Sequence, residues 1–231
     1  MGLKHNMHPT GTIHKNLKTV QQAIDSALRE NNRLENATKL IAVSKTRPQE
    51  VIEHALKAGQ RLFGENRVQE TEQKWVGLKK LYPDAQLHLI GPLQTNKAAL
   101  AVSLFDVIET IDRLKLATAV SRHIKETGRK VLCFIQVNTG KEQQKAGVFP
   151  EAADRFIETC RSTLNLSVEG LMCIPPTDEE PALHFALLRK IAERNNIKEL
   201  SMGMSADYET AIQFGATYVR IGTAIFGSRP H

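Results

Sequence analysis

A lysine stands where a predicted core strand ends. The segment 40–44 is short and mostly apolar, which predicts a buried strand. Lys45 follows it directly. Burial disfavours the ammonium form of a lysine, so an amine held here is expected to be neutral and nucleophilic. A neutral amine condenses with an aldehyde to form a Schiff base. A strand-end lysine can also simply extend into solvent, and Lys45 alone does not decide between the two interpretations.

A second group of residues, near the C-terminus, has the chemistry of a phosphate site. Ser205 follows Gly203 and precedes a predicted helix, where a serine is a good N-cap. Backbone amides at the start of a helix bind phosphate groups. Gly222 and Thr223 lie near the end of the last predicted strand, 218–226, and offer a closely approachable backbone and one hydroxyl. Ser205 can equally serve as a helix cap and nothing more.

Arg220 lies inside that last predicted strand. It alternates with Val219 and Ile221, so its side chain faces the opposite side of the strand from theirs. A guanidinium keeps its charge, and a buried one needs an acceptor. An arginine in a core strand is therefore expected to face a polar partner or ligand.

The elements that position these residues alternate regularly between strand and helix. Eight predicted strands follow one another without a tight hairpin, which implies parallel strands and favours a (β/α)8 TIM barrel; an open doubly wound sheet is the alternative. An extra helix is predicted at about 13–33, and residues 1–231 are expected to form a single domain. The predicted strands are 40–44, 61–64, 86–90, 107–110, 131–137, 166–172, 199–202 and 218–226, and the helices between them are 48–58, 67–81, 96–102, 113–126, 150–161, 181–195 and 205–214.

The barrel brings the two groups of residues together. Active sites of such barrels lie at the carboxyl ends of the strands, and phosphates often bind after strands seven and eight. Strand eight neighbours strand one when a barrel closes, so Lys45, Arg220 and the Ser205, Gly222 and Thr223 group are expected in one pocket. An amine that reacts with aldehydes, a cation directed at a ring and a set of phosphate donors describe a site for pyridoxal 5′-phosphate (PLP).

Composition argues against several other classes of protein. The chain has 231 residues, 41% hydrophobic and 24% charged, and no apolar run reaches the roughly 18 residues of a membrane span. The net charge is +6, but the basic residues are spread along the helices and only 5% of residues are aromatic, so no nucleic-acid partner is expected. Cys133, Cys160 and Cys173 are expected to be reduced thiols of a cytoplasmic protein.

Seven stretches of the chain resemble the YggS/PROSC family of pyridoxal phosphate homeostasis proteins. The resemblance runs in order from Leu40 to Arg229 and leaves the segment before Leu40 uncovered. A series of motifs in order is more specific than any one of them. The stretches are AVSK (42–45), FGEN (63–66), HLIGPLQTNK (88–97), QVN (136–138), GLM (170–172), SMGMS (201–205) and RIGTAIFG (220–227).

The resemblance implies a barrel of the alanine-racemase type (PLP fold type III) without that enzyme's C-terminal β domain. It implies that Lys45 forms the Schiff base with PLP and that Ser205, Gly222 and Thr223 bind its phosphate. It also implies that Arg220 faces the pyridine nitrogen. No catalytic residue and no metal ligand is predicted.

Four further features match the family or the site less specifically. Asn66 matches a family position near the cofactor, with no assigned role. The stretch 91–97 matches a family signature whose purpose the sequence does not explain. Lys141 and Lys145 follow Asn138 in a loop where they could contact an anion, although lysines in loops are usually solvated.

An arginine at the ring nitrogen disfavours strong carbanion chemistry, because it cannot hold a proton there as the carboxylate of aminotransferases does. The resemblance accordingly implies a PLP binder of intracellular vitamin B6 and amino-acid homeostasis. The small size and the missing second domain favour a monomer, and PLP-dependent apoenzymes are candidate recipients of the cofactor. A weak amino-acid racemase is the alternative, and it needs a second acid or base opposite Lys45. None of Tyr82, Tyr208 and Tyr218 stands in an obvious position for that role. A phosphosugar enzyme on the same barrel would not need Lys45 paired with Arg220.

Overall fold

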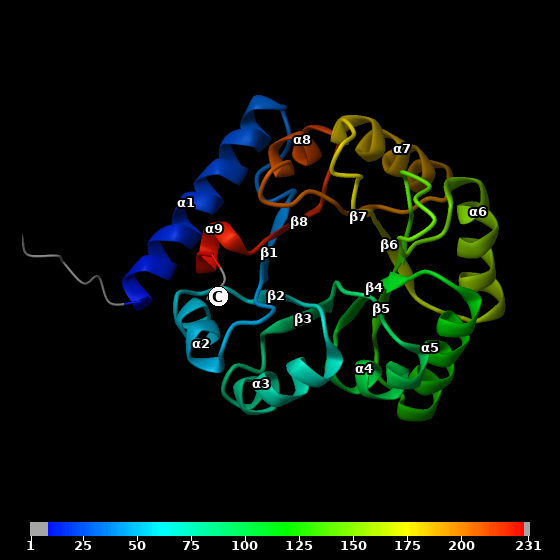
Figure 1. The fold of residues 1–231 in the computed structure, drawn as a ribbon, viewed down its shortest axis with the longest axis horizontal. Coiled ribbons are helices and arrows are strands. Elements are labelled where there is room, and N and C mark those ends of the chain that lie inside the picture. Colours follow the sequence, from blue (N-terminus) through cyan, green and yellow to red (C-terminus); the bar gives the residue numbers. More distant parts are fainter. Residues whose placement is uncertain (1–8, 229–231) are drawn as a thin grey trace, which may run out of the picture.

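The strands of this protein close into one parallel barrel (Figure 1). The computed structural model describes residues 9–228, and in these residues every strand pairs in parallel with the next, while β8 pairs with β1. The predicted (β/α)8 barrel is therefore confirmed, and the open doubly wound sheet is excluded. The strands are β1 (Lys39–Val43), β2 (Leu62–Glu65), β3 (Gln86–Leu89), β4 (Val107–Ile111), β5 (Leu132–Gln136), β6 (Val168–Met172), β7 (Glu199–Ser201) and β8 (Tyr218–Ile221).

Helices surround the barrel and connect consecutive strands (Figure 1). α6 and α7 begin with prolines. Proline has no N–H, but at the first position of a helix this costs no hydrogen bond, because an N–H there has no intrahelical acceptor. No helix within residues 9–228 is both long and apolar enough to cross a membrane. The helices are α1 (Pro9–Glu30), α2 (Gln49–Lys57), α3 (Val68–Leu81), the 3-10 turn η1 (Thr95–Lys97), α4 (Ala98–Leu104), α5 (Leu114–Thr127), α6 (Pro150–Glu158), the π turn η2 (Thr159–Thr163), α7 (Pro181–Arg194), α8 (Tyr208–Gln213) and α9 (Thr223–Phe226).

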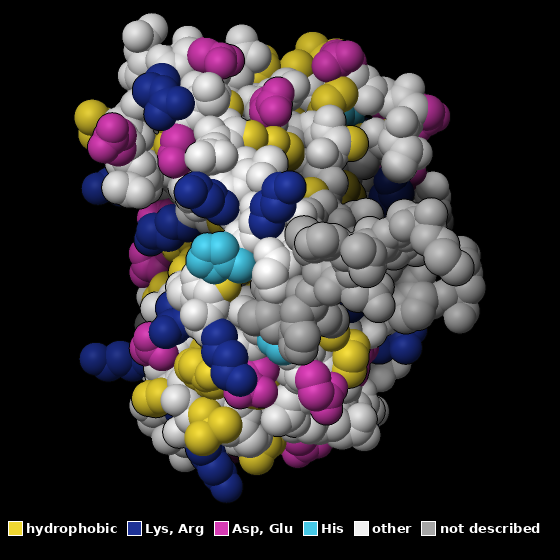
Figure 2. All heavy atoms as spheres, turned by 90° about the vertical axis from the view of Figure 1, so that its left-hand side faces the viewer, with side chains coloured by type: hydrophobic (Ala, Val, Ile, Leu, Met, Phe, Trp, Pro, Cys, Tyr) yellow, Lys and Arg dark blue, Asp and Glu magenta, His cyan; other side chains and the backbone are white. Residues whose placement is uncertain are grey.

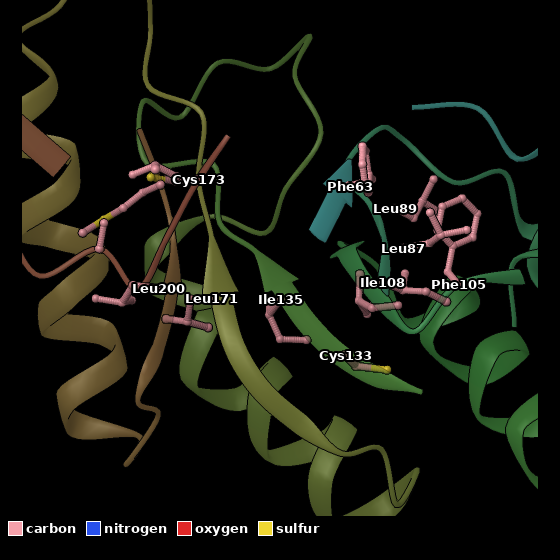
Figure 3. Packing of buried hydrophobic residues seen from close by; sticks show 14 of the residues in the cluster. Phe63, Leu87, Leu89, Phe105, Ile108, Cys133, Ile135, Leu171, Cys173 and Leu200 are labelled. Carbon is pink, nitrogen blue, oxygen red and sulfur yellow. The ribbon is translucent and has the colours of Figure 1, made fainter. Parts of the chain in front are cut away.

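The main core lies between the strands and the surrounding helices. Figure 3 shows the side chains of Phe63, Leu87 and Leu89 gathered with Phe105. Phe63 meets Trp75 of α3 edge to face, with ring centroids 4.9 Å apart. Burying each such side chain contributes about 1.5–3 kcal/mol, which holds α3 and α4 against β2 and β3.

The interior of the barrel is filled differently at its two ends. A small apolar cluster of Ile41, Val107, Phe134 and Tyr218 fills the part towards the amino ends of the strands. Polar side chains, described below, are buried beyond it towards the carboxyl ends. The apolar cluster fills one end, and the buried polar side chains that could contact a ligand lie towards the other end.

The N-terminal helix α1 packs beside α2, α8 and α9 (Figure 1). The helix predicted at about 13–33 is confirmed, although it begins by Pro9 and ends at Glu30. The side-chain amide of Asn16 donates a hydrogen bond of 2.9 Å to the carbonyl of Ile225 in α9. α1 thereby holds the short helix that follows β8. On the face where α1 lies, Lys and Arg side chains are interspersed with Asp and Glu (Figure 2).

Two predicted boundaries near the C-terminus are wrong. The last strand ends at Ile221 rather than at 226, and residues 223–226 form α9. Ile221 pairs with Ala42, and β1 ends one residue later, so the chain beyond Ile221 has no strand left to pair with. The preceding helix begins at Tyr208 rather than at Ser205, which lies in an exposed turn.

Candidate functional site

Three of the predicted site residues follow neighbouring strands at the same end of the barrel. Val43 pairs with Gly64 in the β1·β2 ladder, so Lys45 and Asn66 lie level with each other at the ends of these strands. Gly222 lies against β1 from the other side: a Cβ built on it would be 3.1 Å from the carbonyl oxygen of Val43. The close approach of β1 and β8 therefore depends on glycine at this position.

The predicted phosphate donors lie on the adjoining loops after β7 and β8. The amide of Arg220 donates 3.0 Å to the carbonyl of Gly203, which ties the first loop to β8. Gly203 has φ +90°, and a Cβ there would lie 2.5 Å from that of Ala211, so only glycine fits. Ser205 is not the N-cap that was predicted: Asp207 holds that position, and its Oδ1 accepts 2.6 Å from the amide of Met204.

The hydroxyls of Ser205 and Thr223 are on exposed residues. Gly222 is the residue before α9, and no side chain caps that helix. Amides at the start of a helix have no intrahelical acceptor. Two hydroxyls and the amides that begin α9 therefore remain to bind an anion, as the PLP phosphate requires.

A buried carboxylate holds the strand end that carries Lys45. Ser44 donates 2.7 Å from Oγ to Oε1 of Glu65, whose side chain is fully buried. The ammonium of Lys74, on α3, lies 2.8 Å from the same oxygen. Ser44 faces outward to α3, and Lys45, the next residue, is half-buried.

The turn after Lys45 is held by the same helix. Lys74 donates 3.0 Å to the carbonyl of Ser44 and 2.8 Å to Oε1 of Glu70. That oxygen also accepts 2.6 Å from the amide of Thr46, whose φ of +62° is unusual for a β-branched residue. Partial burial raises the pKa of Glu70, but the hydrogen bonds from Lys74 and Thr46 hold it below its ordinary value.

Arg220 is buried inside the barrel and donates hydrogen bonds to two polar partners. Its Nη1 donates 2.7 Å to Oγ of Ser201, and its Nη2 donates 2.8 Å to the carbonyl of Cys173. The expectation that Arg220 needs an acceptor is confirmed. Ser201 in turn donates 2.5 Å to Oε2 of Glu109, whose Oε1 lies 2.7 Å from Nδ1 of His88.

This interior network leaves polar capacity for a ligand. Only two of the five N–H groups of the Arg220 guanidinium are used by the partners named above. Nε2 of His88 is buried without a hydrogen-bond partner among the described residues. The residues therefore fit PLP: an amine for its aldehyde, a cation for its ring and donors for its phosphate.

The three cysteines are buried free thiols, as predicted. Burial raises the pKa of each thiol to about 12. They stay neutral at physiological pH and are poor nucleophiles.

Residues of the 91–97 stretch and Lys145, which were predicted without an assigned role, line cavities at the carboxyl end of the barrel. Residues of the 91–97 stretch line a cavity of about 760 Å³. Lys145 lines a smaller one of about 250 Å³ and is ion-paired with Glu142 at 2.6 Å. Lys141 is ion-paired with Glu151.

Sequence reasoning missed the residues that support Lys45 and Arg220. Glu109 was the clearest signal, because a carboxylate inside an apolar strand needs a partner. Glu70 and Lys74 stand four residues apart, the spacing of an ion pair on one helix face. Ser201 stood out only as the first residue of the 201–205 stretch, since a serine in a strand has no particular meaning by itself.

The fold and the site define a PLP-type barrel of the alanine racemase class: the profile of the family "Alanine racemase, N-terminal domain" matches residues 13–230. The chain is 40% identical over 227 residues to the pyridoxal phosphate homeostasis protein of Haemophilus influenzae, covering 94% of this chain and 96% of that protein. The protein of the same name from Escherichia coli K12 is 38% identical over 228 residues, covering 95% and 97%. This chain belongs to the family of pyridoxal phosphate homeostasis proteins.

Solved structures agree with this assignment. PipY of Synechococcus elongatus, solved with PLP bound, superposes with a TM-score of 0.80 at 35% identity and covers 93% of this chain and 100% of that chain. An alanine racemase of Clostridium difficile has a TM-score of 0.71 at 16% identity. That likeness, which covers 96% of this chain but 58% of the racemase, shows the shared barrel alone.

Proposed function

We propose that this chain binds PLP at the carboxyl end of its barrel and acts in intracellular vitamin B6 homeostasis. Family membership and the PLP-bound structure of PipY support the cofactor. The observation that carries the proposal is the meeting of β1 and β8. There, Lys45 follows β1, Arg220 lies in β8, and α9 begins just after β8.

Each proposed site residue matches one part of the cofactor. PLP supplies an aldehyde that condenses reversibly with a primary amine, and Lys45 supplies that amine. Ser205, Thr223 and the amide of Gly222 donate hydrogen bonds to the phosphate. Arg220, oriented by Ser201 and Cys173, donates to the pyridine nitrogen. Asn66 lies beside Lys45 at the end of β2.

The chain, we further propose, holds and releases PLP rather than turning over a substrate. Arg220 donates hydrogen bonds and keeps its proton, so it leaves the ring nitrogen unprotonated and a weak electron sink. Tyr218, inside the barrel, and Tyr208, at the start of α8, are poor second bases. Burial raises the pKa of Tyr218 to about 12, and burial together with Glu209 raises that of Tyr208.

The proposal has two further parts. The chain delivers PLP to PLP-dependent apoenzymes, and it acts as a monomer in which residues 1–231 form one domain. A half-buried lysine at an open barrel end suits exchange of the aldehyde with the lysine of a recipient. The three reduced thiols fit a reducing compartment, which supports a cytoplasmic location. Light scattering on the purified chain tests the monomer. Activation of an apoenzyme while free PLP is trapped tests delivery.

Titration with PLP and with pyridoxal, followed by visible absorbance, tests the site. Pyridoxal is expected to bind at least about a hundredfold more weakly, since each charge-assisted hydrogen bond to phosphate contributes about 1.5–3 kcal/mol. Ser205→Ala and Thr223→Ala should each weaken PLP binding about tenfold. Thr118→Ala, which removes an exposed hydroxyl on α5, is the matched control. Equal affinities for PLP and pyridoxal would remove the phosphate site from the proposal.

Exchange of the α-proton of alanine in deuterated water tests the absence of turnover. At most trace exchange is expected. Exchange on the order of one per second or faster would establish a racemase-like activity instead.

A further inference from the structure

The cavity of about 760 Å³ has an unusual charge. It lies between the loops that follow β2, β3 and β4, away from the loops after β7 and β8 that carry the phosphate donors. Three cations, Arg67, Lys97 and Arg113, and one carboxylate, Asp112, are among its lining residues. The lining therefore carries a net formal charge of +2.

The single carboxylate is already used. Oδ1 of Asp112 accepts 2.6 Å from Arg113, which also donates 2.9 Å to the carbonyl of Leu93. These contacts fix the guanidinium of Arg113 at the wall of the cavity. The side chain of Lys97 is half-buried and makes no hydrogen bond or ion pair within residues 9–228.

The positions of the two arginines add to the unbalanced charge. Arg67 directly precedes α3 and Arg113 directly precedes α5, and neither helix has a side-chain cap. The helix dipole disfavours a cation at this end of a helix. An anion in the cavity would offset the unfavourable interaction of the two arginines with the helix dipoles. It would also balance the partly desolvated charge of Lys97.

The cavity also has apolar walls and a defined relation to Lys45. Val68, Leu93 and Pro92 line it, which provides a surface for an organic group. Asn66 lines it as well, and the β1·β2 register places Asn66 level with Lys45. The cavity thus opens beside the proposed PLP site on its β2 side.

We propose that this cavity binds a second ligand, the dianion of a small organic phosphate ester. The net charge of +2 matches a phosphate monoester dianion. Lys97 and Arg67 donate to its oxygens, Arg113 is held ready by Asp112, and Val68 and Leu93 contact the organic part. This assigns a role to the 91–97 stretch that goes beyond binding PLP.

Calorimetric titration with phenyl phosphate tests the proposal. The protein is used in two forms: without PLP, and with PLP fixed by borohydride so that the first phosphate site is filled. One site is expected in the fixed form and two in the free form. Lys97→Ala and Arg67→Ala should each weaken the site of the fixed form about tenfold or more. Lys125→Ala, on the exposed surface of α5, should leave it unchanged.

Three results would overturn the proposal. The fixed form could bind no phenyl phosphate, or Lys97→Ala could bind it as tightly as Lys125→Ala. Succinate, a dianion with carboxylates only, could bind as tightly as phenyl phosphate, which would exclude a phosphate-ester site. If borohydride fixes no PLP, the proposed function fails. The second site is then decided in the free form, where phenyl phosphate must still bind and Lys97→Ala, but not Lys125→Ala, must weaken that binding.

Discussion

Two buried carboxylates, Glu65 and Glu109, support opposite sides of the proposed PLP site in related ways. Each accepts a hydrogen bond from a strand serine: Ser44 donates 2.7 Å to Glu65, and Ser201 donates 2.5 Å to Glu109. Each side chain is fully buried. Ser44 directly precedes Lys45, and Ser201 accepts a hydrogen bond from Arg220; both Lys45 and Arg220 are proposed to hold PLP. The difference lies in where the balancing cation is.

Glu65 meets its cation directly, whereas Glu109 reaches one through a hydroxyl. Lys74 lies 2.8 Å from Glu65 and also binds the backbone of Ser44. Arg220 contacts Ser201, which contacts Glu109. The first network, outside the barrel, fixes the main chain that carries Lys45. The second, inside the barrel, fixes a side chain and leaves it N–H groups for a ligand.

The largest expected effect is the loss of stability when a buried ion pair is broken, compared with a half-exposed ion pair on the same helix, α3. Lys74→Met leaves Glu65 charged and unbalanced, and removing one partner of a buried pair costs about 3–5 kcal/mol. Lys79→Met breaks the half-exposed pair with Asp106 and should cost about 1 kcal/mol or less. Urea unfolding measures both. Similar losses for the two variants would contradict a structural role for the Glu65 network.

The interior network is tested by Glu109→Gln. This change keeps the shape but removes the charge that balances Arg220, and the free energy of unfolding should fall by about 1.5–3 kcal/mol. The visible spectrum of bound PLP should also change, because Arg220 would be held differently. Glu169→Gln, on the exposed side of β6, is the control and should change stability by about 0.5 kcal/mol at most. An unchanged spectrum would separate Glu109 from the ligand.

The two serines sharpen the comparison. Ser44→Ala and Ser201→Ala should each cost about 1–3 kcal/mol, because each leaves a buried carboxylate with one donor fewer. Their effects on PLP should differ. Ser201→Ala should alter the spectrum of bound PLP, whereas Ser44→Ala should mainly reduce the yield of PLP fixed by borohydride. If Ser44→Ala instead altered the spectrum and Ser201→Ala mainly reduced the yield of fixed PLP, the roles assigned to the two networks would be wrong.

A gradual loss of stability is expected at alkaline pH, and the thiol of Cys173, whose carbonyl belongs to the interior network, contributes to it. Burial raises the pKa of the Cys173 thiol from 9.0 to about 12, and the carbonyl of this residue accepts from Arg220. The unfolded chain loses this proton above pH 9 while the folded chain keeps it, so stability is constant below that pH and falls above it. The slope should be about 1.4 kcal/mol per pH unit for this thiol.

Urea unfolding between pH 8 and 12 measures that slope. Cys173→Ala should flatten the curve by the contribution of one thiol. An identical slope in the variant and the parent would show that the thiol is not held neutral by the fold.

The barrel and the meeting of β1 with β8 could be predicted from the sequence, because both follow from local patterns. Apolar runs separated by amphipathic helices require parallel strands, and closure makes the first and last strands neighbours. Lys45 and Gly222 could thus be placed at one end without knowledge of any contact.

The two networks could not be predicted, because they depend on strand register. Ser44 and Glu65 are 21 residues apart in sequence, and Glu109 and Ser201 are 92 apart. The error at the end of β8 has the same cause. The apolar residues 224–226 continue the strand pattern, but β1 ends too early to pair with them.

Peptide mapping after borohydride reduction of the PLP-loaded protein tests the central claim most directly. That claim is that the Glu65 network presents Lys45, and no other lysine, to the aldehyde. The account predicts that the fixed cofactor is on the peptide containing Lys45 and is lost in Lys45→Ala. A cofactor fixed in equal yield on another lysine, such as Lys145 at the neighbouring cavity, would contradict it.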